Sequence, residues 1–168
     1  MAHPPSEKPM DRPTVRLPQH GGCLCGVTRY RLDAAPLLVY ACHCHDCRIR
    51  SGSAFSLSIL VRTADLTVSG SPKATRRTTP KGREVEDNSC PACGIYMMGH
   101  AVANPDFASL RAGTLDDASW AVPIAQTWIS SALPWAVIPG VAKFEPGSFD
   151  FAKMAEAWRA TAPTFEKA

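Results

Sequence analysis

Residues 42–47 read CHCHDC, which places three thiols within six consecutive positions. Two shorter pairs lie on either side of this stretch, CLC at residues 23–25 and CPAC at residues 90–93. Thiolate is a soft ligand, and these spacings allow one turn of backbone to direct two sulfur atoms at one Zn²⁺. The seven cysteines divide most simply into four, which can close a structural site, and three, which leave one position open for water or substrate. The sequence therefore predicts two metal sites, one structural and one catalytic.

Disulfide bonds and redox chemistry are the alternatives for these cysteines. The chain opens MAHPPSEKPM, without the apolar core of a secretory signal, so we expect a reducing, cytoplasmic environment in which disulfides are rare. The stretches CHDC (residues 44–47) and CPAC (residues 90–93) have the C-x-x-C spacing of redox proteins. We expect neither to open a helix after a strand of a βαβ unit, which a thioredoxin-like motif requires. In CPACG, Gly94 is typical of a zinc knuckle, because a residue without Cβ lets the backbone close around a metal-bound sulfur.

The C-x-C spacing also has a simple geometric meaning. Residues i and i+2 of a β-strand point to the same face, so Cys23 and Cys25 can both reach one ion, as can Cys42 and Cys44. Spacing alone leaves open which distant pair completes which site, because the first pair could join either of the later clusters.

Length and composition indicate one domain. The chain has 168 residues, 45% of them hydrophobic, which is enough for one sizeable core. Residues 1–18 contain five prolines and few large apolar side chains, a composition that predicts a disordered tail. We therefore expect a single zinc-binding catalytic domain over residues 19–165.

The hydrophobic pattern predicts a mostly β chain with one helix near its C-terminus. The predicted strands cover residues 27–32, 37–41, 54–61, 66–69, 73–78 and 95–102. Residues 54–61 are the clearest, since apolar residues alternate there with small or polar ones. The helix is predicted after Ser148 or Asp150, either of which could cap it. Its apolar face consists of Phe151, Met154, Ala155 and Trp158.

The charge pattern argues against a nucleic-acid partner. The net charge is only +3, although one basic cluster contains no intervening acid: Lys73, Arg76, Arg77, Lys81 and Arg83. A solvated strand or loop face is the usual meaning of such a cluster, and binding of a small acidic substrate is the alternative.

Residues 118–142 carry no charge and are long enough to cross a bilayer. Three prolines within them would break a spanning helix, so we expect burial and no membrane partner. Trp128 and Trp135 are then predicted to be core residues, with a wall of a substrate cleft as the alternative for one of them.

Three motifs together resemble a known family. GGCLCG (residues 21–26), CHCHDCR (residues 42–48) with the following Ser51-Gly52, and CPACG (residues 90–94) resemble the glutathione-dependent formaldehyde-activating enzyme family, also called the centromere protein V family. AGTLDD (residues 112–117), Pro134-Trp135 and Phe144 extend the resemblance over roughly residues 19–146. The resemblance implies a mostly β, Mss4-like fold of zinc-stabilised antiparallel sheets.

The resemblance also implies ligand sets and a reaction. Cys23, Cys25, Cys90 and Cys93 would hold a structural zinc, and Cys42, Cys44 and Cys47 a catalytic one. The implied reaction is the addition of glutathione, or a related thiol, to formaldehyde or a small aldehyde, as in a carbon–sulfur lyase that acts as an S-(hydroxymethyl)glutathione synthase. A three-thiolate zinc carries a charge of −1, so it suits the activation of a thiol better than the polarisation of a carbonyl. A glutathione carrier and a non-catalytic binding module remain the alternatives.

Two residues beside the cysteines are further candidates. Arg48 would either steady the sulfur atoms or bind a glutathione carboxylate. Alternation places His43 opposite its neighbouring cysteines, which favours a supporting or core role for this histidine.

Overall fold

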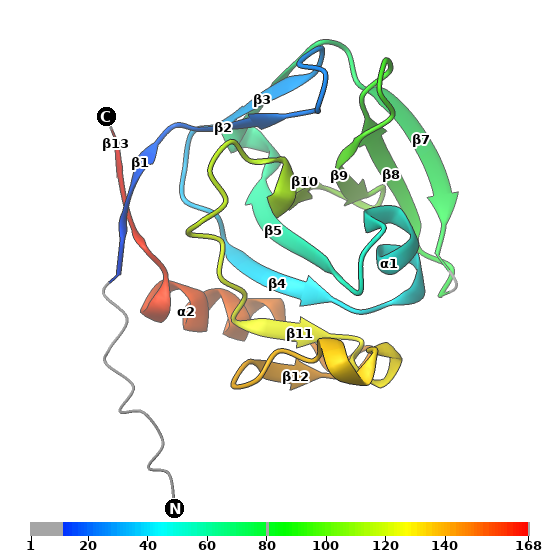
Figure 1. Cartoon of the computed structure of the whole chain (residues 1–168), viewed down its shortest axis with the longest axis vertical. Helices are drawn as coiled ribbons and strands as arrows, with labels where there is room; N and C mark the ends of the chain where they lie inside the picture. Colours follow the sequence, from blue (N-terminus) through cyan, green and yellow to red (C-terminus); the bar gives the residue numbers. More distant parts are fainter. Residues whose placement is uncertain (1–11, 80, 168) are drawn as a thin grey trace, which may run out of the picture.

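An eight-stranded sheet forms the body of the molecule (Figure 1). The computed structural model of the chain describes residues 12–79 and 81–167. Within these residues the strand order of the sheet is β12-β11-β4-β5-β10-β9-β8-β7. The bounds are β4 (Leu38–Cys42), β5 (Ser56–Arg62), β7 (Lys73–Thr78), β8 (Glu84–Ser89), β9 (Tyr96–Ala101), β10 (Asn104–Arg111), β11 (Ala125–Thr127) and β12 (Ala142–Phe144). All neighbours from β4 to β7 in this order are antiparallel, whereas β11 lies parallel to both β4 and β12.

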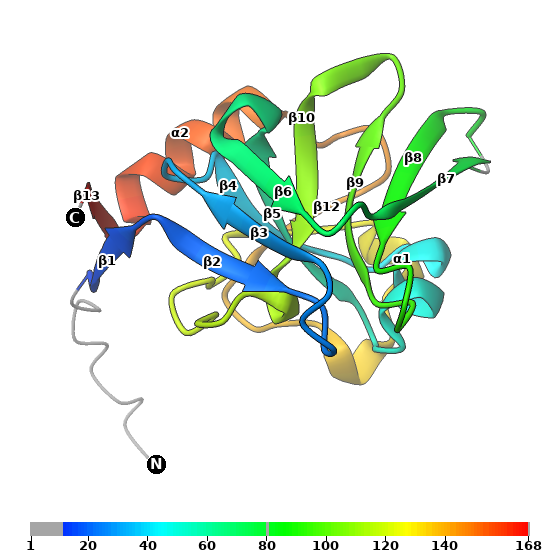
Figure 2. The ribbon, with the colours of Figure 1, turned by 90° about the horizontal axis from the view of Figure 1, so that it is seen from above.

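Two smaller sheets accompany the large one. A three-stranded antiparallel sheet contains β2 (Gln19–Gly22), β3 (Arg29–Leu32) and β6 (Leu66–Ser69), which lie side by side in Figure 2. A parallel pair joins β1 (Thr14–Leu17) to β13 (Thr164–Lys167). The α-helices are α1 (His45–Ser51), between β4 and β5, and α2 (Phe151–Thr161). Short 3₁₀ turns are η1 (Thr63–Asp65), η2 (Ala112–Thr114), η3 (Ile129–Ser131) and η4 (Pro134–Ala136).

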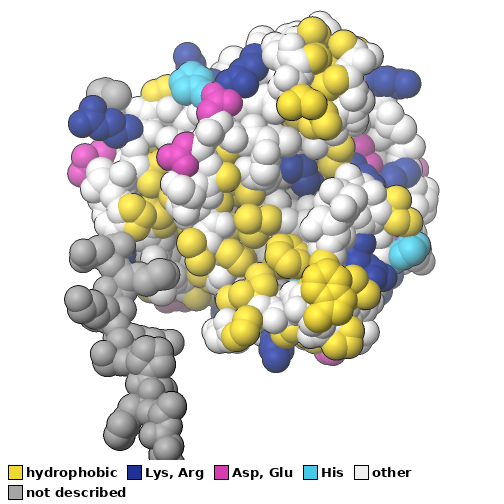
Figure 3. All heavy atoms as spheres, in the orientation of Figure 1, with side chains coloured by type: hydrophobic (Ala, Val, Ile, Leu, Met, Phe, Trp, Pro, Cys, Tyr) yellow, Lys and Arg dark blue, Asp and Glu magenta, His cyan; other side chains and the backbone are white. Residues whose placement is uncertain are grey.

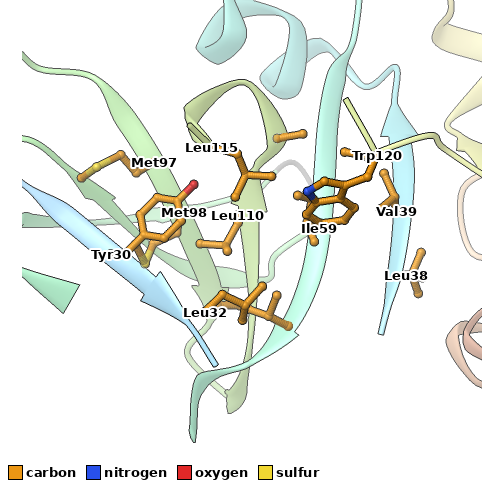
Figure 4. Close-up of a cluster of buried hydrophobic side chains, with 14 of the residues drawn as sticks. Tyr30, Leu32, Leu38, Val39, Ile59, Met97, Met98, Leu110, Leu115 and Trp120 are labelled. Carbon is orange, nitrogen blue, oxygen red and sulfur yellow. The ribbon is translucent and has the colours of Figure 1, made fainter. Parts of the chain in front are cut away.

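The core lies between the three-stranded sheet and the large sheet (Figure 4). Leu32 of β3 and Ile59 and Leu110 of the large sheet are fully buried. The indole of Trp120 covers the same cluster and donates from Nε1 to Oε1 of Gln19, at 2.9 Å. This packing satisfies the polar atom of the tryptophan while its ring excludes water.

The prediction of a mostly β chain with a C-terminal helix is confirmed. Each of the six predicted strands is present, with its ends shifted by up to two residues. Helix α2 begins where it was predicted, because the Asp150 carboxylate accepts from the backbone N–H groups of Ala152 and Lys153. Trp158 of its apolar face is only 2% exposed. The parallel pairings of β11 were not predicted.

The predicted tail of residues 1–18 is too long at its C-terminal end. Thr14–Leu17 forms β1, in which Val15 and Leu17 are buried and Val15 lies beside Phe165 of β13. The alternation of buried and exposed residues in this strand was masked by the flanking prolines. Residues 1–11 lie outside the described residues.

Residues 118–142 fold as an irregular segment around β11 and two 3₁₀ turns. In the parts of the chain that the structure describes, no helix combines the length and apolar character needed to cross a membrane.

Candidate metal centres

The first centre brings together four cysteines from two distant segments. Their sulfur atoms all lie within 4.8 Å of one another: Cys23, Cys25, Cys90 and Cys93. The Sγ atom of Cys25 is 3.5 Å from that of Cys23 and 3.6 Å from that of Cys90. A tetrahedral zinc with Zn–S bonds of about 2.3 Å separates its sulfurs by about 3.8 Å, so this set of four donors fits zinc closely.

Backbone N–H groups surround the sulfur atoms of this centre. Thr28 donates to Sγ of Cys23 at 3.3 Å, and Ala92 and Cys93 donate to Sγ of Cys90 at 3.4 and 3.5 Å. These backbone bonds, with that of Cys93 the strongest, lower the pKa of Cys90 to about 6. Gly94 has φ +73° and its N–H reaches the Cys90 carbonyl at 3.0 Å, which confirms the predicted knuckle turn.

The second centre is formed by cysteines that are close in sequence. Cys42 is the last residue of β4, Cys44 caps α1, and Cys47 lies in the first turn of that helix. The Sγ atoms of Cys42 and Cys44 are 3.5 Å apart, and the backbone N–H of Cys47 donates to Sγ of Cys44 at 3.4 Å. The three sulfurs fall within the same 4.8 Å limit as the first four. Cys42 is buried, and the other two are half-buried.

CHDC opens a helix, but this helix does not belong to a βαβ unit, as predicted. Residues 44–47 stand at the start of α1, directly after β4. The next strand, β5, runs antiparallel to β4, so the unit is not the βαβ crossover of a thioredoxin-like motif. This strand arrangement favours metal binding over thioredoxin-like redox chemistry for these cysteines.

The three sulfurs of the second centre share negative charge. Interaction with the sulfurs of Cys44 and Cys47 lowers the pKa of Cys42 to about 3. The same contacts raise the pKa of Cys47 far above its usual range, and that of Cys44 is also raised. Without a cation, only one of the three ionises readily. A divalent ion would permit all three to be thiolates, which is the chemistry that zinc requires of its ligands.

A buried guanidinium lies behind the second centre. Arg111, the last residue of β10, donates from Nη1 to the hydroxyls of Ser56 and Ser58 and from Nη2 to the phenol oxygen of Tyr96, at 3.1 Å. Ser56 is the register partner of Cys42, so the guanidinium and that cysteine share a face of the sheet. Burial alone would lower the pKa of Arg111, but Tyr96 and Cys47 raise it above its usual value. Arg111 was not predicted as a site residue, although it is a lone cation between the apolar residues Leu110 and Ala112 in the sequence.

His43 has a structural role, in agreement with the favoured prediction. It is fully buried, and its Nε2 lies 3.2 Å from Oε1 of Gln126. The amide nitrogen of Gln126 donates to the carbonyls of Ile138 and Val141, so Oε1 faces the histidine and Nε2 carries the proton. Burial lowers the pKa of His43, which keeps the ring neutral. The contact between His43 and Gln126 connects the residue after β4 to β11. The hydrogen bonds of Gln126 to Ile138 and Val141 extend this connection to the segment before β12.

An open groove runs along one side of α1. Its volume is about 420 Å³, and its lining residues are His45, Arg48, Ile49, Gly52, Ser53, Ala54, Leu133 and Trp135. Trp135 is 78% exposed, so the prediction that it is a core residue is wrong, and the alternative of a cleft wall describes its position. Trp128 is half-buried beneath Lys81, whose Nζ lies 4.8 Å from its ring centre. In Figure 3 hydrophobic side chains gather on the lower part of the visible face, around the position of β11 and β12 in Figure 1.

Arg48 and the basic cluster differ in their partners. Within residues 12–79 and 81–167, Arg48 forms no ion pair with a carboxylate, and its buried Nε has no hydrogen-bond partner. Arg76 instead pairs with Glu86, and Arg77 pairs with Asp46 and Asp87. Two charges of the basic cluster are therefore neutralised by acids of β8 and α1. This weakens the alternative that the cluster binds an acidic substrate.

A family model described as glutathione-dependent formaldehyde-activating enzyme matches residues 18–131. The chain belongs to this family. The residues matched to the family include both cysteine groups, Arg48, His43 and Arg111, whereas Trp135 lies beyond them. No curated protein matches the chain significantly. Among solved structures, a Rhodobacter sphaeroides protein is 20% identical, with a TM-score of 0.47, and the alignment covers 74% of this chain and 98% of that one.

Proposed function

We propose that this chain is a single-domain, zinc-dependent enzyme of the carbon–sulfur lyase type. It adds glutathione, or a related small thiol, to formaldehyde or another small aldehyde, and with glutathione and formaldehyde the product is S-hydroxymethylglutathione. The structural zinc is assigned to Cys23, Cys25, Cys90 and Cys93, and the catalytic zinc to Cys42, Cys44 and Cys47. The observation that carries the proposal is that α1, whose N-terminal residues supply two of the three clustered sulfurs, also lines the open groove.

The reaction needs no redox partner. The thiol sulfur attacks the carbonyl carbon, the C–S bond forms, and the π electrons move to the oxygen, which takes a proton from water. Zinc held by Cys42, Cys44 and Cys47 would supply a position at which an incoming thiol gives up its proton to water. A free thiol with a pKa of about 8.5 is only about 3% ionised at pH 7, so complete ionisation contributes about 2 kcal/mol. Orientation of the two reactants can contribute more, up to about 7–11 kcal/mol.

The residues of the groove are suited to orienting glutathione. The guanidinium of Arg48 has no carboxylate partner within the described residues, and glutathione carries two carboxylates that can accept from it. Leu133 and Trp135 offer an apolar wall to the rest of the tripeptide. We therefore assign substrate binding to Arg48.

A glutathione carrier is the alternative function, because thiols add to formaldehyde without a catalyst. A nucleic-acid-binding module is disfavoured, since Arg76 and Arg77 already pair with acids. A reducing compartment such as the cytoplasm would keep the seven thiols available for metal, and we propose that location.

Calorimetry with three thiol probes tests the proposal. Glutathione should bind more tightly than cysteamine, which lacks carboxylates, and S-methylglutathione should bind far more weakly because it cannot become a thiolate. Arg48→Gln should weaken glutathione about tenfold and leave cysteamine unchanged, since a charge-assisted hydrogen bond is lost. Arg83→Gln is the matched control, because it removes the same charge outside the groove.

The same variants separate enzyme from carrier. In the enzyme, adduct forms faster than in protein-free buffer at equal glutathione and formaldehyde. Binding of glutathione with no gain in rate would support the carrier. Equal affinity for all three probes would exclude a thiol site at the second centre.

A further inference from the structure

Helix α1 carries Cys47 but buries none of its seven residues completely. Helices this short are unstable by themselves in water, because nucleation costs more than a few hydrogen bonds return. Ile49, the aliphatic residue of the helix, is 67% exposed. Apolar packing therefore does not explain what holds this helix in place.

Ion pairs join α1 to the edge of the large sheet. Asp46 accepts from Nη1 of Arg77 at 2.6 Å, and Nε of Arg77 donates to Asp87 at 2.8 Å. The second oxygen of Asp87 accepts from Arg50 of α1, also at 2.8 Å. Asp46 and Arg50 lie four residues apart on one face of the helix, so the pairs form a closed circuit from α1 through β7 and β8 and back.

This circuit is shielded from solvent. The side chain of Asp87 is 10% exposed and that of Arg77 is 30% exposed, whereas Arg76 in the neighbouring pair is 69% exposed. Partly buried pairs with good hydrogen-bond geometry are stronger than surface pairs, and removal of one partner leaves an uncompensated charge.

The neighbouring strand is shaped to accommodate the circuit. The guanidinium carbon of Arg50 lies 3.5 Å from the ring centre of Tyr96. At Gly99 on β9, a Cβ would stand 2.6 Å from Oδ1 of Asp87 and 2.6 Å from the phenol oxygen of Tyr96. A residue with a side chain at this position would displace both groups. Figures 1 and 2 both show α1 beside β8.

We propose that Asp46, Arg50, Arg77 and Asp87 are positioning residues that hold α1 so that Cys47 completes the three-sulfur centre. Asp46 is the residue directly before Cys47, so its contact with Arg77 fixes the turn from which that sulfur projects. Cys42 belongs to β4, and the large sheet positions it independently of the circuit. Loss of the circuit would therefore leave the sulfur of Cys42 in place, whereas those of Cys47 and of Cys44, which caps the helix, would move with α1. The inference rests on the proposed metal site at the second centre.

Two neighbouring arginines provide a matched test. Arg77→Gln breaks the circuit, and Arg76→Gln removes an equal charge from the adjacent position of β7, where Arg76 pairs with Glu86 outside the circuit. Zinc affinity is measured by competition with a chromogenic chelator. Arg77→Gln should lower the affinity of the second zinc by about 10–100-fold, the usual effect of removing support for a ligand. The first zinc should be unchanged, and Arg76→Gln should match the unaltered chain at both sites.

Three further measurements keep the outcomes distinct. With Co²⁺ as the probe, Arg77→Gln should lose thiolate-to-metal absorption belonging to the second equivalent only, and Arg77→Lys should recover part of it. If Arg77→Gln does not fold, Asp46→Asn replaces it, because this change removes only the link nearest Cys47. Equal second-site affinity in the unaltered chain and in Arg77→Gln or Asp46→Asn overturns the inference, as does an equal loss in Arg76→Gln. An unaltered chain that binds only one zinc overturns the proposed function instead.

Discussion

The two cysteine groups differ in how they are built into the fold. The group of four joins the end of β2 to the turn after β8, and its contact between Cys25 and Cys90 spans 65 positions of sequence. The group of three lies within residues 42–47, on one strand and the helix that follows it. A metal bound by the first group closes a long loop between two sheets, whereas a metal bound by the second group closes almost none. The first site is therefore expected to support folding, and the second is free to serve chemistry.

Substitution of one cysteine in each group gives the strongest test of this difference between a folding site and a chemical site. Cys93→Ala should unfold or aggregate the protein, because structural zinc contributes about 10–16 kcal/mol to folding in small zinc domains. Cys47→Ala should remain folded and lose one zinc together with any thiol-dependent activity. Metal content and thermal unfolding of both variants give the answer. Equal destabilisation would make the second site structural as well, and the proposed enzyme would lose its main support.

The number of protons displaced when zinc binds provides a second test of the group of three cysteines. In the metal-free second group, Cys42 with a pKa of about 3 is already ionised at neutral pH, whereas the raised pKa values of Cys44 and Cys47 keep those thiols protonated. Zinc should therefore displace about two protons, and its affinity should rise by about a hundredfold per pH unit between pH 5 and 8. Acidification acts in the opposite direction and releases the metal.

Calorimetry in two buffers of different ionisation enthalpy counts these protons, with Cys47→Ala as the reference for the first site alone. A release of three protons would mean that Cys42 is not ionised before zinc binds.

The smallest effects are expected from substitution of two glycines, one beside each cysteine group. Gly94 follows the knuckle of the first group with φ +73°, and Gly52 caps α1 with φ +59°. A Cβ at either position would meet no atom within 4 Å, so alanine introduces only backbone strain of about 1–2 kcal/mol. Gly94→Ala should speed the loss of the first zinc to a chelator, and Gly52→Ala that of the second. Loss of the same zinc in both variants would contradict the independence of the two sites.

The sequence predicted the parts of the site that depend on local spacing. The three short cysteine motifs were visible because such ligand spacings act through one turn, whereas the pairing of residues 23–25 with residues 90–93 came from the family resemblance. The strand at residues 54–61 was visible because its apolar residues alternate. The serines that alternate with these apolar residues, Ser56 and Ser58, are buried and accept hydrogen bonds from Arg111. The contact between Arg111 and Ser58 joins residues more than fifty positions apart in the sequence, so no local sequence pattern predicts it.

Strand β8 was missed, and Trp135 was first expected in the core with a cleft wall as the alternative, for related reasons. The β8 sequence EVEDNS has the polar composition of a loop, and its acids are useful only because β7 and α1 place arginines opposite them. Trp135 was expected in the core because large apolar side chains are generally buried. Its 3₁₀ turn presents it to the groove instead.

The pairing of β1 with β13 makes the two ends of the described chain neighbours. Thr14 lies opposite Thr164, and the strands run in the same direction, so the last residue of β13 lies one strand length from the first residue of β1. Four residues of strand span about 13 Å, which a linker of about six residues can bridge. A circularly permuted chain, joined here and opened in a surface loop, would keep every sheet and both cysteine groups. Figure 1 places this junction on the side of the molecule away from α1, so the end of the chain is a suitable point for attachment to a solid support.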